Sequence, residues 1–153
     1  MENKTTPIEI RMGLREEYLP MLMEVEQACF SDPWTEAAFR SELSNNYSFY
    51  VLAFEGERIV GYVGGMSLYE TCDINNVAVL PEMRRRGIAS ALLDRFFAEA
   101  KERGAQQVLL EVRAGNTAAI GLYEGYGFKP YGVRKNYYQN PAEDAVLMVV
   151  TLC

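Results

Sequence analysis

The stretch VLLEVRAGNTAAIGLYEGYGF, residues 108–128, joins a predicted strand to a predicted helix and places a carboxylate in an apolar run. Successive side chains of a strand point to opposite faces, so Glu111 shares its face with Arg113. A buried carboxylate without partners is costly. Glu111 is therefore either one half of an ion pair with Arg113 or a general base facing a cleft, and the stretch alone leaves both open.

The helix in this stretch has clear end signals. Asn116 is a favourable N-cap, and Gly125 or Gly127 can end the helix. Tyr123 lies on it and is open to two interpretations. It is an ordinary core tyrosine, or a phenol of pKa ~10 that protonates a departing thiolate whose parent thiol has a pKa near ~8.5.

The rest of the chain alternates strand and helix patterns without repeats or linkers, and hairpins are expected early and late. We expect one domain over residues 1–153, of mixed α/β (α+β) class and built on one sheet. The second helix is expected to begin at Ser31 or Asp32. Strands are expected at 7–13, on both sides of the turn 55–58, and at 71–81, 106–113, 129–138 and 144–152; helices are expected at 15–30, 31–43, 87–104 and 116–128.

The composition excludes several chemistries. The chain has no histidine, so imidazole bases, Ser-His triads and His-ligated metals are ruled out. Cys29, Cys72 and Cys153 are scattered and form no CxxC pair, so neither a disulfide framework nor a metal site is expected. The formal charge of −6 argues against nucleic-acid binding and suits a cationic substrate.

The N-terminal stretch MENKTTPIEI lacks the apolar core of a secretory signal, and no run reaches the ~20 apolar residues of a membrane helix. We therefore expect a cytoplasmic protein that does not associate with membranes. We also expect it to be a monomer or a weak homodimer.

The segment RRRGIAS, residues 84–90, follows a predicted strand and opens the long helix at 87–104. Backbone N–H groups at a helix start bind anions, and Gly87 allows close approach of a phosphate. The segment lacks the GxxxxGK pattern of a Walker loop and the later glycines of a dinucleotide fingerprint. A pyrophosphate cradle and a solvated basic turn both remain open for it.

Four ordered blocks of the chain together resemble the GNAT superfamily of N-acetyltransferases, and more narrowly its RimI branch, which acetylates protein N-termini. Arg84, Gly87 and Ala89 fit the acetyl-CoA motif [QR]xxGx[GA]. In this motif two residues separate the first position from the glycine, and one residue separates that glycine from the final Gly or Ala. The other blocks are EVRAGNTAAIGLYEGYGF, similar to EVRxxNxxAixLYexlGF, then RKNYY with EDAVLM, and DPWTEAAFRSEL. The resemblance spans essentially the whole chain and implies a central, mostly antiparallel mixed sheet with helices on both faces and a splayed acetyl-CoA cleft.

The resemblance also implies roles for individual residues. Glu111 falls on the proton acceptor of the branch and Tyr123 on its proton donor, while a backbone N–H near Val79 should hold the acetyl carbonyl. Gly115 departs from the pattern, because relatives often have a small polar residue there, and it is expected to loosen the turn. Acetyl-CoA contacts are implied for Val77, Ala78, Val79, Arg85, Arg86, Gly87, Ile88, Ala89, Ser90 and Asn116. Peptide-groove positions, for which ordinary surface or core residues remain an alternative, are Phe30, Pro33, Trp34, Tyr137 and Tyr138.

The function implied by the resemblance is transfer of an acetyl group from acetyl-CoA, without a metal, to a protein N-terminus. In the RimI branch the typical target is the N-terminal alanine of ribosomal small-subunit protein eighteen. Two alternatives stay open: acetylation of a small-molecule amine or a protein lysine, and a non-catalytic acetyl-CoA-binding module. Glu111 and Tyr123 together disfavour the last.

Overall fold

The structure is a computed structural model that describes residues 6–152. Residues 1–5 of the N-terminal stretch and Cys153, the third cysteine, lie outside the described residues. Backbone proximity groups the chain into two compact units, whereas the expectation of one domain over residues 1–153 stays a prediction. The first unit comprises residues 1–64 and 76–98, and the second comprises residues 65–75 and 99–153.

Seven strands follow one another in the sheet order β1-β2-β3-β4-β5-β7-β6. The pairs β1–β2, β5–β7 and β6–β7 are antiparallel, whereas β4 and β5 run parallel. The predicted mixed α/β class with a mostly antiparallel sheet is thereby confirmed. The strands are β1 (Ile8–Met12), β2 (Ser48–Glu55), β3 (Arg58–Leu68), β4 (Thr71–Val79), β5 (Gln107–Arg113), β6 (Lys129–Tyr138) and β7 (Glu143–Thr151). The helical segments are η1 (Glu16–Tyr18), α1 (Leu19–Cys29), α2 (Glu36–Glu42), η2 (Pro81–Met83), α3 (Ile88–Glu102) and α4 (Thr117–Gly125).

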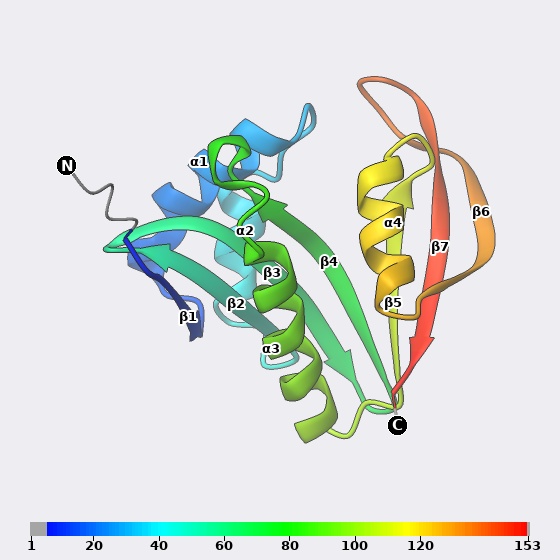
Figure 1. Cartoon of the computed structure of the whole chain (residues 1–153), viewed down its shortest axis with the longest axis horizontal. Helices are drawn as coiled ribbons and strands as arrows, with labels where there is room; N and C mark the ends of the chain where they lie inside the picture. The colour runs from blue at the N-terminus through cyan, green and yellow to red at the C-terminus, as the bar shows by residue number, and fades with distance from the viewer. Residues whose placement is uncertain (1–5, 153) are drawn as a thin grey trace. The chain divides into compact units, whose positions relative to one another are not determined.

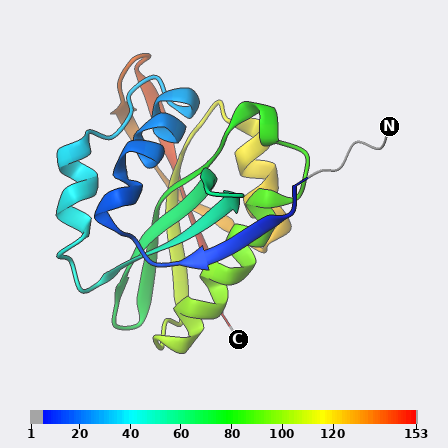
Figure 2. The same cartoon turned by 90° about the vertical axis from the view of Figure 1, so that its left-hand side faces the viewer.

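The first unit packs α1, α2 and most of α3 with β1, β2 and the adjoining parts of β3 and β4. Figure 2 shows α1 and α2 side by side. Phe49 of β2 stacks on Phe96 of α3 with ring centroids 4.6 Å apart. A Cβ at Gly61 of β3 would lie 2.9 Å from the Ala78 carbonyl oxygen, so this close approach of β3 to β4 requires glycine.

Helix α2 begins later than the sequence predicted, because the N-cap is Thr35 rather than Ser31 or Asp32. The Thr35 hydroxyl accepts the Ala38 N–H at 3.1 Å. The segment before it is held elsewhere, since the Trp34 N–H donates to the carboxylate of Glu26 on α1 at 2.8 Å. The residue before the cap is therefore held by a side chain of the preceding helix, and α2 starts after it.

The second unit carries the C-terminal strands, which lie side by side in Figure 1. Strand β5 pairs with β4 from Gln107↔Thr71 to Leu110↔Ile74, and with β7 along its whole length. Asn116 caps α4 as predicted, its side-chain oxygen accepting the Ala119 N–H at 3.1 Å. Gly127, with φ +96°, follows the helix end. This geometry places the EVRAGN turn directly beyond β5.

Candidate active site

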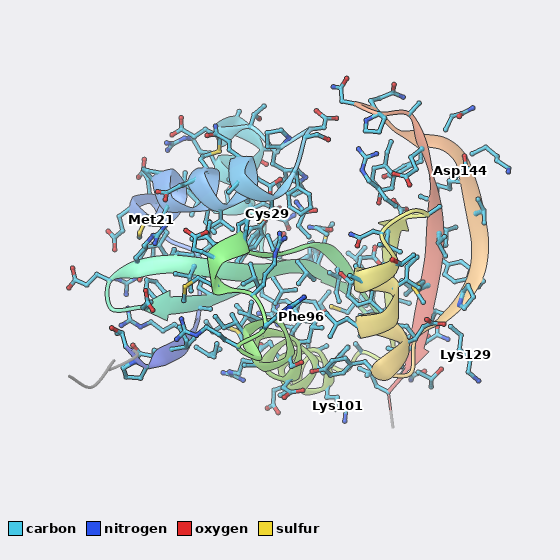
Figure 3. All side chains as sticks on the ribbon, turned by 45° about the horizontal axis from the view of Figure 1, so that its top comes forward. Met21, Cys29, Phe96, Lys101, Lys129 and Asp144 are labelled. Carbon is cyan, nitrogen blue, oxygen red and sulfur yellow. The ribbon has the colours of Figure 1, made fainter. Side chains whose placement is uncertain are left out.

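The end of β4 carries Val77, Ala78 and Val79, the first segment predicted to contact acetyl-CoA. Ala78 and Val79 are buried and Val77 is half-buried. The Val79 carbonyl accepts hydrogen bonds from the Cys29 thiol and from Nε of Arg84, each at 3.3 Å. Cys29 lies at the end of α1 and is labelled in Figure 3. Two side chains of the same unit therefore fix this strand end.

The turn at residues 84–90 has the backbone expected of an anion cradle. Arg85 and Gly87 have φ of +65° and +75°, and α3 starts at Ile88. The N–H of Ala91 donates to the Gly87 carbonyl at 3.0 Å. The N–H groups of the residues before Ala91 lie in the first turn of the helix, where amides have no intrahelical acceptor. No heavy atom lies within 4 Å of a Cβ built on Gly87, so the turn is open at this point.

The three arginines of this turn have different environments. Arg84 bonds the Val79 carbonyl, and Arg86 forms an ion pair with Glu55 at 3.4 Å. Arg85 is exposed, and within residues 6–152 its guanidinium takes part in no ion pair. Of the three arginines, Arg85 is therefore the one whose charge is most accessible to an anion.

Glu111 occupies the middle of β5 and is half-buried, its side chain being 31% exposed. The predicted alternation of the strand is confirmed: Val108, Leu110 and Val112 are buried. The cation near Glu111 is Arg134 of β6, with Nε 3.5 Å from the carboxylate, and not Arg113. The ion pair with Arg113 was one of the two interpretations left open for Glu111. The structure pairs Glu111 with Arg134 instead, from β6, which lies beyond β7 in the sheet.

Arg113 instead holds the loop between β6 and β7. Its guanidinium forms an ion pair with Glu143 at 3.2 Å and donates to the backbone carbonyls of Gln139 at 2.6 Å and Pro141 at 2.9 Å. It also lies 4.6 Å from the ring centroid of Tyr138, in cation–π range. Arg113 thus fixes the hairpin that carries both predicted groove tyrosines, Tyr137 and Tyr138.

Gly115 is fixed by the same hairpin. Its N–H donates to the Glu143 carboxylate at 2.6 Å, and a Cβ built on it would lie 2.5 Å from that oxygen. The absence of a Cβ at Gly115 thus lets Glu143 approach this turn closely, while the expectation that the glycine loosens the turn stays a prediction.

Tyr123 of α4 is buried, with 7% of the residue exposed, and its ring lies 5.7 Å from that of Phe128. Burial, and to a smaller extent Tyr138, raise the pKa of Tyr123 to about 12. Burial is also the main reason that the pKa of Tyr138 is raised to about 12. Tyr123 is therefore protonated near neutral pH, as a proton donor must be.

Tyr137 lies within an irregular part of β6 that extends from Arg134 to Tyr138. Asn136 in this part has φ +52° and donates its N–H to the Asp144 carboxylate at 2.9 Å. Asp144 is labelled in Figure 3. A hydrogen bond to Glu111, followed by burial, raises the pKa of Tyr137. Tyr137, a predicted groove residue, therefore contacts Glu111, the predicted base.

The predicted groove residues of the first unit, Phe30, Pro33 and Trp34, lie between α1 and α2 and are all half-buried. The Trp34 ring lies 5.3 Å from that of Phe39 on α2. The buried acceptor of the Trp34 N–H, Glu26, was missed from the sequence. Its signal is an acidic residue on the face of α1 that buries Leu19, Leu22 and Val25.

The predicted site residues divide between the two units: positions up to Ser90 lie in the first, and positions from Glu111 onward lie in the second. Arg134 and Asp73 of the second unit were also missed. Burial and the charge of Glu111 raise the pKa of Asp73. Within the described chain no three His, Cys, Asp or Glu residues gather in a way that could hold a metal ion, and no helix is long and apolar enough to cross a membrane.

Residues 19–128, more than half of the chain, match the model of the Acetyltransferase (GNAT) family, so the chain belongs to that family and is an acyltransferase. A relative from Escherichia coli (strain K12), named ribosomal protein bS18-alanine N-acetyltransferase, is 34% identical over 88% of this chain and 91% of its own length.

Two solved structures agree with this assignment. The crystal structure of the ribosomal-protein-S18-alanine N-acetyltransferase from Escherichia coli has a TM-score of 0.85 at 30% identity, and the match covers 94% of each chain. Arabidopsis thaliana NAA60, solved in complex with acetyl-CoA, also has a TM-score of 0.85, covering 95% of this chain and all of the other. Its identity is 19%, so that match shows the fold alone.

Proposed function

We propose that this protein transfers the acetyl group of acetyl-CoA to the N-terminal α-amine of a protein, and that its substrate is the N-terminal alanine of ribosomal protein bS18. The observation that carries the proposal is the similarity to the Escherichia coli bS18-alanine N-acetyltransferase, which extends over 88% of the chain. This substrate places the enzyme in the cytoplasm with the ribosomes.

The chain's own residues suit acetyl-CoA. The turn at 84–90 offers helix-start amides, the open face of Gly87 and the exposed Arg85, a combination that favours a pyrophosphate. Val77 to Val79 and Asn116 are the further contacts that we assign to the coenzyme. Acetyl-CoA supplies the activated thioester when it is bound.

In the proposed reaction Glu111 accepts the proton of the attacking amine, directly or through one water molecule. Its side chain is 31% exposed, pairs with Arg134 at 3.5 Å and accepts a hydrogen bond from Tyr137. Tyr123 donates its phenolic proton to the departing thiolate, since a phenol is protonated near neutral pH and can supply that proton. A backbone N–H at Val79 donates to the acetyl carbonyl oxygen and stabilises the charge that develops there.

The choice of an α-amine follows from proton affinity. An α-amine has a pKa of ~7.7–8.0, whereas a lysine amine has a pKa of ~10.4, so far more of the former is neutral near pH 7. A carboxylate base matches the more acidic amine. Tyr137 and Tyr138, with Phe30, Pro33 and Trp34, are the side chains that we assign to the peptide groove.

An acetyl-CoA turnover assay with short peptides and polyamines tests the proposal. We expect peptides with a free N-terminal alanine to be acetylated much faster than spermidine. Faster turnover of spermidine would favour a small-molecule acetyltransferase, and no turnover of any amine would favour a binding module.

A further inference from the structure

Glu26 is a buried carboxylate that the proposed reaction does not use. Only 1% of the residue is exposed, although it lies on the helix face that also buries Leu22 and Val25. A carboxylate in such a position is costly unless hydrogen bonds satisfy it. Its partners therefore indicate what the residue does.

Every partner of the Glu26 carboxylate is a donor. The Trp34 backbone N–H lies 2.8 Å from Oε2, and the Tyr62 hydroxyl of β3 donates to Oε1. The Asn76 side-chain amide of β4 donates to both oxygens, at 3.4 and 3.3 Å. An acceptor-only group satisfies all three donors, which is the property of an ionised carboxylate and not of a carboxamide.

The same tyrosine holds Trp34 by a second route. The Tyr62 ring lies 5.9 Å from that of Phe39, and the Phe39 ring lies 5.3 Å from that of Trp34. Trp34 is thus fixed at its backbone through Glu26 and at its ring through Phe39. Both routes end on Tyr62, a fully buried residue of the sheet.

We propose that Glu26 is a positioning residue that fixes the loop of residues 30–34 to β3 and β4 and thereby sets the affinity for the acceptor peptide. The proposal rests on the proposed function, because it takes this loop to line the peptide groove. Glu26 bonds the backbone of Trp34 itself at 2.8 Å, whereas it reaches the predicted acetyl-CoA segment only through Asn76, the residue before Val77. Its larger effect is therefore expected on the peptide rather than on acetyl-CoA.

The chain offers a direct probe of the loop, because Trp34 is its only tryptophan. Glu26→Gln places an amide N–H₂ among three donors and leaves them a single acceptor oxygen, which should weaken the hold on the Trp34 N–H. We expect the acrylamide quenching constant of Trp34 fluorescence to rise about twofold. We expect the peptide KM to rise about tenfold, which corresponds to about 1.4 kcal/mol, with kcat and the acetyl-CoA KM within twofold of wild type.

Glu42→Gln is the matched control. Glu42 also accepts a hydroxyl from a buried tyrosine, Tyr50 at 3.1 Å, and one from Ser48 at 2.8 Å. The substitution makes the same chemical change on α2, at a carboxylate whose bonds to Tyr50 and Ser48 hold β2 rather than Trp34, so both readouts should match wild type. Tyr62→Phe removes one of the three donors and should move both readouts in the same direction as Glu26→Gln, but less.

Unchanged quenching and peptide KM in Glu26→Gln would overturn the inference, and so would equal changes in Glu42→Gln or equal rises in both KM values. If Glu26→Gln does not fold, Tyr62→Phe decides by the same two readouts. The quenching measurement needs no substrate. A wild-type enzyme that fails to acetylate free N-termini would therefore refute the proposed function, while quenching still tests whether Glu26 holds the loop.

Discussion

Replacing Tyr123 by phenylalanine removes one hydroxyl and should have two separate effects. As the proposed proton donor, Tyr123 should contribute the 10²–10⁴-fold in kcat that is typical of acid–base groups. As a buried phenol of raised pKa, it should also make the stability of the protein fall at alkaline pH. The second effect is independent of substrate.

The size of the alkaline effect follows from burial. The pKa of Tyr123 rises from its ordinary value of 10.0 to about 12, and each unit corresponds to about 1.36 kcal/mol. Above pH 10 the unfolded chain loses this proton while the folded chain retains it, so stability declines as pH rises. The free energy of unfolding falls by about 1.4 kcal/mol at pH 11, and the loss levels off at about 2.7 kcal/mol above pH 12.

Urea unfolding of wild type and Tyr123→Phe at pH 8 and pH 11 measures this contribution. Other buried tyrosines destabilise both proteins alike, so the difference between the two pH-dependent losses isolates Tyr123. We expect wild type to lose about 1.4 kcal/mol more than the variant. Tyr131→Phe is the control, because Tyr131 is 53% exposed and its removal should leave the wild-type loss unchanged.

Equal alkaline losses in wild type and Tyr123→Phe would show that burial does not raise the pKa of this phenol. A folded Tyr123→Phe protein with wild-type kcat would refute its role as proton donor. The two readouts fail independently, so a structural role and a catalytic role can be told apart.

Glu111→Gln should lower kcat by about 10²–10⁴-fold with unchanged circular dichroism, and a wild-type kcat would exclude Glu111 as the base. Arg113→Ala should lower the free energy of urea unfolding by about 1–3 kcal/mol and raise the peptide KM, because it breaks a charged network that fixes the β6–β7 loop. Gly87→Ala should cost about 1 kcal/mol of stability, because φ is +75°. Calorimetry should also find weaker acetyl-CoA binding to Gly87→Ala, and unchanged affinity would argue against the cradle.

Local patterns in the sequence predicted each strand and each α-helix, but not all of their ends. Alternation along β5 and the Asn116 cap depend on neighbouring residues, and both were predicted correctly. The start of α2 was missed because Ser31, Asp32 and Thr35 are all acceptable caps, and the choice depends on Glu26 bonding Trp34 from another helix. Propensity cannot resolve such a choice.

The surroundings of Glu111 show the same limit for the site. Strand periodicity correctly placed Arg113 on the same face, yet a loop 26 to 30 residues away binds its guanidinium. Arg134 takes the position near Glu111 because β6 carries it there, which no local pattern indicates. The family resemblance gave the residue roles, but only tertiary structure identifies the charges around them.

The central claim is tested most directly by finding which nitrogen receives the acetyl group. A peptide that begins with alanine and contains one internal lysine is incubated with enzyme and acetyl-CoA, and tandem mass spectrometry locates the product. We predict a single acetyl group on the α-amine and no turnover of the same peptide with a blocked N-terminus. Acetylation of the lysine, or equal turnover of the blocked peptide, would contradict the proposed function.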